Sequence, residues 1–179
     1  MTEEEIRDRR ALEWVCGRNV NGELSLGVKK NALVPTYCIG LKDVSTKMVC
    51  SSSNHTILLA SNGTCFLAGS KLHGKLGKNA DTSKLTIFKE MPLQRTVKQV
   101  ACNDYQTLCL LQDSTLIQMA GSHNFEPKPL PSLMGLTITD IQCGEHHSCA
   151  LDTNGDLYTW GGQTPQYNKG QLGHGDHKP

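Results

Sequence analysis

The chain has 179 residues, of which 37% are hydrophobic and 20% are charged, and this composition is typical of a globular domain or of part of a larger one. Its 18 basic and 17 acidic side chains leave a formal charge of +1, so no overall field would attract nucleic acid or acidic lipid. The sequence has no run of 18 uncharged apolar residues and no secretory signal. We therefore expect a cytoplasmic or nuclear protein that does not bind membranes.

The first segment, residues 1–11, is dense in charge. Thr2 and Glu5 have the spacing of a capping box, and Glu3 and Arg7 are spaced for an ion pair on a helix. Because a helix this short is marginal by itself, we expect a short helix or a disordered segment ahead of the first folded unit.

The rest of the chain repeats a set of three short phrases. The first phrase is a strand-like run with a histidine or glutamine in its middle, found at residues 49–59, 100–110 and 141–151. The second is a strand that ends in glycine, at residues 13–17, 65–69, 117–121 and 157–161. The third contains Gly-x-Leu and is missing from one unit, at residues 22–27, 74–77 and 170–173. The repeats divide the chain into four units, at roughly 12–48, 49–99, 100–140 and 141–179.

Tight turns separate the first and second phrases. Asn62-Gly63 and Asn154-Gly155 lie between apolar runs, which is the strongest short signal for a two-residue hairpin. The third unit has Asp113-Ser114 there instead, which predicts a looser turn in the least stable unit. Repeats of roughly 40 to 50 residues made of short strands, without a 3.6-residue apolar period, indicate propeller blades.

The last unit has the most specific sequence motifs. Residues 157–161, Leu-Tyr-Thr-Trp-Gly, are followed at 170–176 by Gly-Gln-Leu-Gly-His-Gly-Asp, and residues 143–151 fit the same pattern. These motifs resemble the repeat of the regulator of chromosome condensation family. The earlier units depart from it where Ser53 and Asn103 replace a glycine and where other residues replace tryptophan. The resemblance still covers residues 12–179.

The resemblance implies an all-β fold, a seven-bladed β-propeller of the regulator of chromosome condensation type. This length supplies three to four blades, about half of the ring, so the ring is not closed within residues 12–179. Open blade edges favour association. We therefore expect a piece of a longer protein, or else two chains that pair through these edges.

Several repeated residues have an expected structural role. Glycine fits where a strand is crowded at the propeller axis and where φ is positive, and this applies to Gly17, Gly69, Gly121 and Gly161. Trp14 and Trp160 occupy equivalent places and are expected in the core between blades. His55 and His147 are expected to hydrogen-bond the backbone of the next blade.

Eight cysteines are present without any Cys-x-x-Cys pair, so we expect free thiols. Cys143, His146, His147 and Cys149 suggest zinc by composition. Strand alternation, however, would send His146 to the opposite face from the other three, so we expect no metal. No phosphate-binding glycine loop is present, and we expect no cofactor.

No catalytic set is found, because Ser148 and His147 are sequence neighbours that a strand points apart. We expect a protein-interaction platform, not an enzyme. The alternative implied by the resemblance is guanine-nucleotide exchange on a Ran-like small GTPase. By position, the family's exchange face corresponds to residues 53–54, 104–105 and 145–146. We therefore expect partner binding by Asn54, Asp104, Tyr105, Glu145 and His146. Chromatin binding ranks lower, because the arginines of residues 1–11 are balanced by acidic side chains.

Overall fold

The computed structural model describes residues 13–76, 84–120, 127–162, 167 and 169–176. Regular structure in this part is β apart from two single-turn 3-10 helices, η1 (Leu72–Gly74) and η2 (Pro131–Leu133). The described residues include no helix of the length and apolarity that a bilayer crossing needs. Residues 1–11, for which a short helix or disorder was predicted, and Gly121 lie outside the described residues.

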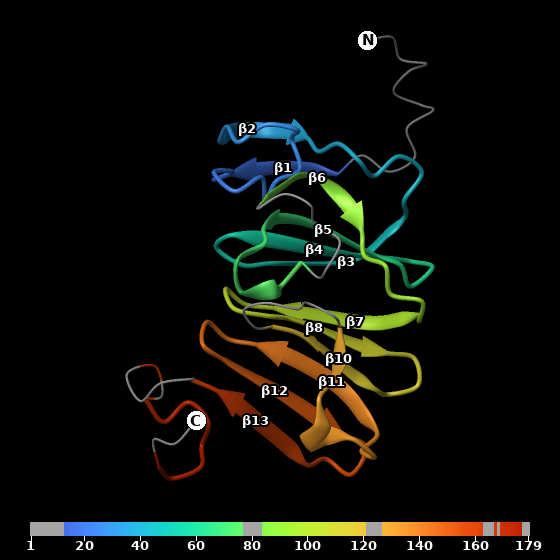
Figure 1. Cartoon of the computed structure of the whole chain (residues 1–179), viewed down its shortest axis with the longest axis vertical. Coiled ribbons are helices and arrows are strands. Elements are labelled where there is room, and N and C mark those ends of the chain that lie inside the picture. The colour runs from blue at the N-terminus through green and yellow to red at the C-terminus, as the bar shows by residue number, and fades with distance from the viewer. Residues whose placement is uncertain (1–12, 77–83, 121–126, 163–166, 168, 177–179) are drawn as a thin grey trace.

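The strands form four antiparallel sheets that stack one on another (Figure 1). We call them blades 1 to 4. Blade 1 contains β1 (Trp14–Gly17) and β2 (Ala32–Tyr37). Blade 2 contains β3 (Thr46–Ser51), β4 (His55–Ala60), β5 (Cys65–Ser70) and β6 (Lys84–Glu90). Blade 3 contains β7 (Val97–Cys102), β8 (Thr107–Leu111), β9 (Leu116–Met119) and β10 (Lys128–Pro129). Blade 4 contains β11 (Ile138–Cys143), β12 (His147–Asp152) and β13 (Leu157–Gly161). The prediction of all-β blades is confirmed.

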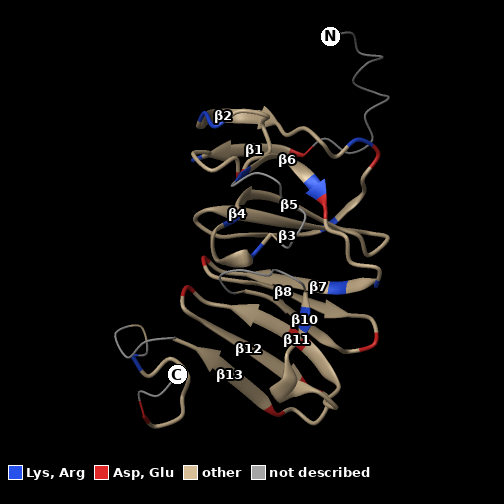
Figure 2. Ribbon diagram, in the orientation of Figure 1, with Lys and Arg blue, Asp and Glu red and all other residues tan. Residues whose placement is uncertain are grey.

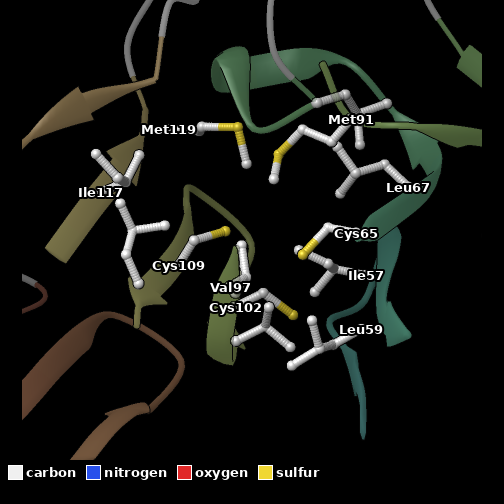
Figure 3. Packing of buried hydrophobic residues seen from close by; sticks show 13 residues of the cluster. Ile57, Leu59, Cys65, Leu67, Met91, Val97, Cys102, Cys109, Ile117 and Met119 are labelled. Atoms are coloured by element: carbon white, nitrogen blue, oxygen red, sulfur yellow. The ribbon is translucent and has the colours of Figure 1, made fainter. Parts of the chain in front are cut away.

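The core lies between the blades, because the second strand of each inner blade is buried on both faces. In β4, Ile57 and Leu59 join the cluster shared with blade 3, whereas Leu58 joins the cluster that faces blade 1. Figure 3 shows the cluster between blades 2 and 3, where Met119 and Cys109 point toward residues of blade 2. Successive side chains on a strand point to opposite faces, so a strand between two blades must be apolar throughout.

The outermost blades keep apolar side chains at the surface. Leu33 of blade 1 is 93% exposed and Leu157 of blade 4 is 65% exposed. Trp14, which was predicted in a core between blades, is 55% exposed and stacks on Tyr37 of its own blade at 3.7 Å between ring centroids. The prediction for Trp14 is wrong because no described blade lies on the outer side of blade 1.

The predicted looser turn of the third unit is also wrong. The amide of Ser114 donates to the carbonyl of Leu111, as Gly63 does to Ala60 and Gly155 to Asp152. Ser114 has a φ of 66°, close to the 86° and 87° of Gly63 and Gly155. The Asp113 carboxylate holds this turn by accepting the amide hydrogen of Thr115 at 3.1 Å. Asp113 therefore takes the role that asparagine has in the other turns, and Ser114 adopts the left-handed conformation that glycine has there.

This turn provides a matched pair of substitutions. Ser114→Gly is expected to raise the free energy of unfolding by about 0.5–1 kcal/mol, because glycine adopts a positive φ without the Cβ penalty. Gly155→Ser should lower it by a similar amount, since no atom of the described ranges lies within 4 Å of a Cβ there and backbone strain alone acts. Urea unfolding of both variants checks the signs. A Ser114→Gly variant less stable than wild type would contradict this account of the turn.

Candidate functional site

The turns that begin the second strands of blades 2, 3 and 4 lie on one side of the stack, beside η1 (left in Figure 1). We call this side the loop face and define it as residues 52–54, 72–75, 103–106, 144–146 and 167. All five side chains predicted for partner binding belong to it. Their contacts divide them into a buried polar group and an exposed aromatic group.

The buried polar group begins with His55, whose imidazole is fully buried. Its Nε2 lies 2.9 Å from Thr107 Oγ1 of blade 3, and its Nδ1 lies 2.8 Å from Ser52 Oγ. Thr107 donates its own proton to the carbonyl of Lys75, so Nε2 of His55 donates to Thr107 and Nδ1 accepts from Ser52. The next blade is thus contacted at a side-chain hydroxyl, whereas the sequence predicted a backbone contact.

Gln106 makes the equivalent link one blade further along. It occupies the repeat position of His55, and its Nε2 donates to Ser148 Oγ of blade 4 at 2.7 Å. Gln118 donates to the other end of the same amide. His147 holds this position in blade 4, and in the described part of the chain its imidazole has no hydrogen-bond partner. The ring of His147 instead occupies the space beside Gly144, where a Cβ would come within 2.2 Å of it.

Lys75 is the residue of this group that the sequence did not single out. Its side chain is fully buried, and its ammonium donates to the carbonyl of Asp104 at 2.8 Å and to the side-chain oxygen of Asn54. Burial lowers the pKa of Lys75 to about 8, although the nearby charge of Asp104 opposes this. Two of the predicted partner-binding residues are therefore held together by one buried amine.

The carboxylate of Asp104 also bonds to another blade of the protein. It accepts the backbone N–H of Ser53 at 2.9 Å and the hydroxyl of the same residue, and so joins blade 3 to blade 2. Partial burial acts to raise the pKa of Asp104, but the hydrogen bonds from Ser53 and Ser52 and the charge of Lys75 outweigh it and lower the pKa. In this structure Asp104 positions the turn.

The exposed aromatic group is a row of four rings that we call the aromatic row: His73, Tyr105, His146 and Tyr167. His73 and Tyr167 are exposed, whereas Tyr105 and His146 are half-buried. Successive ring centroids lie 5.2, 5.5 and 4.4 Å apart, and the planes are tilted. The row runs from η1 of blade 2 across blade 3 to blade 4 and the segment after it. Glu145, whose side chain is 80% exposed, lies beside it with Oε1 3.5 Å from His146 Nε2.

A cavity of about 300 Å³ opens beneath the row, between blades 3 and 4. Tyr105, His146 and Tyr167 form aromatic walls, while Asn103 and Gln118 contribute amides. Trp160 also lines it, and its ring packs against the apolar cluster shared by the two blades. Two buried nitrogens of these lining residues, Nε1 of Trp160 and Nδ1 of His146, have no hydrogen-bond partner among the residues that the structure describes. An unpaired buried donor costs free energy, so the cavity is poised to accept a polar group.

The glycines that end the second phrase shape this side of the blades. Gly69 and Gly161 have φ values of 111° and 116°, and they pair with His55 and His147 at the beginning of the preceding strand. A Cβ on Gly69 would lie 2.5 Å from the carbonyl oxygen of Asn54. The crowding thus comes from the neighbouring strand of the same blade, whereas the sequence analysis attributed it to the propeller axis.

Metal-ligating side chains do not gather within the described residues, where no group of three or more His, Cys, Asp or Glu residues could hold an ion. Of the residues weighed for zinc, Cys143 has its sulfur 3.3 Å from Ser148 Oγ. Cys149 alternates with Ser148 along β12 and so lies on the opposite face of the strand.

Comparison with known proteins places these features in a family. Residues 138–171 match the model of the Regulator of chromosome condensation (RCC1) repeat. The X-linked retinitis pigmentosa GTPase regulator homolog of Caenorhabditis elegans is 28% identical over 218 residues, which cover 91% of this chain and 15% of that protein. The crystal structure of human WBSCR16 has the same fold, with a TM-score of 0.83 and 22% identity over 95% of this chain and 47% of its own. Prp20p from Saccharomyces cerevisiae, studied for its binding to Gsp1p and histones, gives a TM-score of 0.73 and 21% identity over 93% of this chain and 44% of its own.

This chain thus spans about half the length of the solved propellers and a smaller part of the C. elegans relative. The predicted fold class, a partial propeller with about half of the blades, is confirmed. The matched repeat in blade 4, the relative and the shared fold together identify a partial β-propeller of the regulator of chromosome condensation (RCC1) repeat type.

Proposed function

We propose that the chain is a protein-interaction platform that binds its partner through the aromatic row and the cavity beneath it. The observation that carries this proposal is a pair of buried nitrogens, on Trp160 and His146, that lack a partner within the described part of the chain and belong to residues lining a cavity with aromatic walls. Aromatic side chains dominate the energetics of protein interfaces, because they offer a large rigid surface together with a polar tip.

The described residues also suggest how the platform is held in shape. Tyr105 and His146 are carried by turns whose flanking residues are locked by the links from His55 and Gln106 to the next blade. A preorganised surface loses less entropy on binding than a mobile one. The buried polar group thus supports the exposed aromatic group, and the partner meets mainly the latter.

Alanine substitution tests the proposal. Tyr105→Ala should reduce capture of the partner from an extract of the expressing cells about 10-fold, as expected for an aromatic anchor worth ~1.4 kcal/mol. Tyr37→Ala is the matched control, because it removes a ring that stacks on Trp14 in blade 1. Thermal melts establish that both variants are folded, and quantitative mass spectrometry measures the captured proteins. Equal losses for the two variants, or no loss for Tyr105→Ala, would refute the assignment of this face.

The second candidate is guanine-nucleotide exchange on a Ran-like small GTPase. It is favoured by the exposed carboxylate of Glu145 next to His146, at positions that the family resemblance assigns to the exchange face. The GTPase regulator homolog and the Gsp1p-binding Prp20p support it as analogies. An exchange factor acts by binding the nucleotide-free GTPase more tightly than the loaded one. Unaccelerated release of labelled GDP at micromolar protein would eliminate this candidate.

Self-association is a further property that we propose for the isolated chain, because Leu33 and Leu157 remain exposed on opposite ends of the stack. Light scattering should show a discrete dimer if these faces pair. Chromatin ranks below a protein partner, because Figure 2 shows Lys and Arg scattered over the described ribbon. A cytoplasmic or nuclear location stays a prediction that fluorescence microscopy of the tagged protein would test.

A further inference from the structure

Two thiols meet directly beneath the loop face. Cys50 ends the first strand of blade 2 and Cys102 ends the first strand of blade 3, at the same position of the repeat. Their sulfur atoms lie 3.0 Å apart. A disulfide bond is about 2.05 Å long, so bonding requires an approach of roughly 1 Å.

The contacts polarise this pair. The sulfur of Cys50 accepts hydrogen bonds from the thiol of Cys102 and, at 3.1 Å, from the backbone N–H of Cys102. The bond from the Cys102 thiol is the main cause that lowers the pKa of Cys50 to about 7. Cys50 is partly buried at the edge of the apolar cluster between the blades, and Cys102 is buried within that cluster. One thiol is therefore activated and reachable from solvent, and the other is held next to it.

The other cysteines lack this combination. Cys65 and Cys109 interact across the same two blades, but both are buried in the cluster of Figure 3. Cys143 holds the equivalent position in blade 4, but its sulfur contacts Ser148 Oγ, and burial raises the pKa of this thiol to about 12.

We propose that Cys50 and Cys102 form a redox modification site that a peroxide converts to a disulfide between blades 2 and 3. The Cys50 thiolate attacks hydrogen peroxide, so that an S–O bond forms, the O–O bond breaks and the released hydroxide takes up a proton to give water. The sulfur of Cys102 then attacks the sulfenic acid of Cys50. The S–S bond forms, the S–O bond breaks, and the Cys102 proton leaves in a second water. The two sulfurs together give up two electrons, which reduce one peroxide to two waters.

The disulfide would affect the geometry of the loop face, because only short segments of chain join the two cysteines to it. Ser52–Asn54 follow Cys50 by two residues, and Asp104 follows Cys102 by two residues. These turns already touch through the bonds from Ser53 to Asp104. Cross-linking the strands below them fixes the spacing between blades 2 and 3, where the aromatic row passes from His73 to Tyr105. Oxidation should therefore raise stability and change the geometry of this surface.

The experiment is peptide mapping of the whole chain after treatment with hydrogen peroxide and alkylation of the remaining thiols. Trypsin leaves Cys50 and Cys65 in one peptide, residues 48–71. A second digestion with a protease that cleaves before aspartate cuts ahead of Asp104. This cut leaves Cys102 in residues 99–103 and separates it from Cys109. The expected product joins 48–71 to 99–103. It should persist in Cys65→Ser and disappear in Cys50→Ser. The melting temperature of the wild type should rise by about 5–10 °C on oxidation and return on treatment with dithiothreitol.

Each other outcome overturns the proposal. A cross-link of Cys102 to Cys143, a cross-link that survives in Cys50→Ser, or oxidation confined to the exposed Cys16 would each show that Cys50 is not the reacting thiol. Fragment ions of the cross-linked wild-type peptide 48–71 also place the bond at Cys50 or at Cys65, so the conclusion does not depend on whether every variant folds.

Discussion

Gly69→Ala is expected to lower the free energy of unfolding by about 3–5 kcal/mol, because two costs combine at this position. Its φ of 111° is a conformation that alanine rarely adopts. A Cβ would also lie 2.5 Å from both the carbonyl oxygen of Asn54 and the Cα of His55. The backbone at the beginning of β4 would have to move, and with it the link from His55 to blade 3.

Gly17 separates these two costs. It has nearly the same φ, 115°, but no atom of the described residues lies within 4 Å of its ideal Cβ position. Gly17→Ala should therefore lose only the cost of backbone strain, about 1–2 kcal/mol. Denaturant titration of both variants gives the comparison. If the two losses are equal, close packing against β4 contributes nothing at Gly69.

Acidification is expected to destabilise the wild-type protein more than a His55→Gln variant. Burial is the main cause that lowers the pKa of His55 to about 3, and the charge of Lys75 adds to it. Glutamine already fills the equivalent position in blade 3, where Gln106 donates to Ser148. His55→Gln should therefore keep the bond to Thr107 and remove the titrating group.

The sign follows from proton binding. An unfolded chain protonates this histidine at a pKa of about 6.5, whereas the folded chain resists protonation down to about 3. The stabilising contribution of neutral His55 is complete above 6.5 and is lost as the pH falls from there toward 3. Between pH 7 and pH 5 the wild type should lose about 2 kcal/mol more than His55→Gln.

Unfolding free energies at the two pH values, measured for both proteins, test this expectation. Gln106→His is the reciprocal variant, and it should gain a pH dependence of the same sign. Identical pH dependence in wild type and His55→Gln would mean that His55 is protonated in the folded protein and is not the buried neutral link described above.

The sequence contained enough information for the blades, because repeated phrases and alternation are local properties. The Asn62-Gly63 and Asn154-Gly155 turns follow from residue type alone. Ser114 was misjudged because a neighbouring carboxylate and the flanking strands hold serine in a conformation that it does not favour by itself. Trp14 was misjudged because its burial depends on which blade lies outside it.

Only some residues of the candidate site could be predicted from the sequence, for a similar reason. Asn54, Asp104, Tyr105, Glu145 and His146 occupy two adjacent positions of the repeat, so a family pattern can point to them. His73 and Tyr167 complete the aromatic row from segments that only the packing of blades brings close. One feature of the sequence could have pointed to Lys75. The residue between the glycine and the leucine of the third phrase is polar in each unit that has the phrase. Glu23, at this position in the first unit, is also buried.

The most direct test of the central claim is a photo-crosslinking measurement in the cells that express the protein. A benzophenone amino acid replaces Tyr105 in the aromatic row in one version of the chain, and Tyr37 in blade 1 in a second version as the matched control. Our account predicts a discrete, light-dependent adduct with another protein from position 105 and none of that mass from position 37. Identical adducts from both positions, or an adduct from position 37 alone, would contradict it.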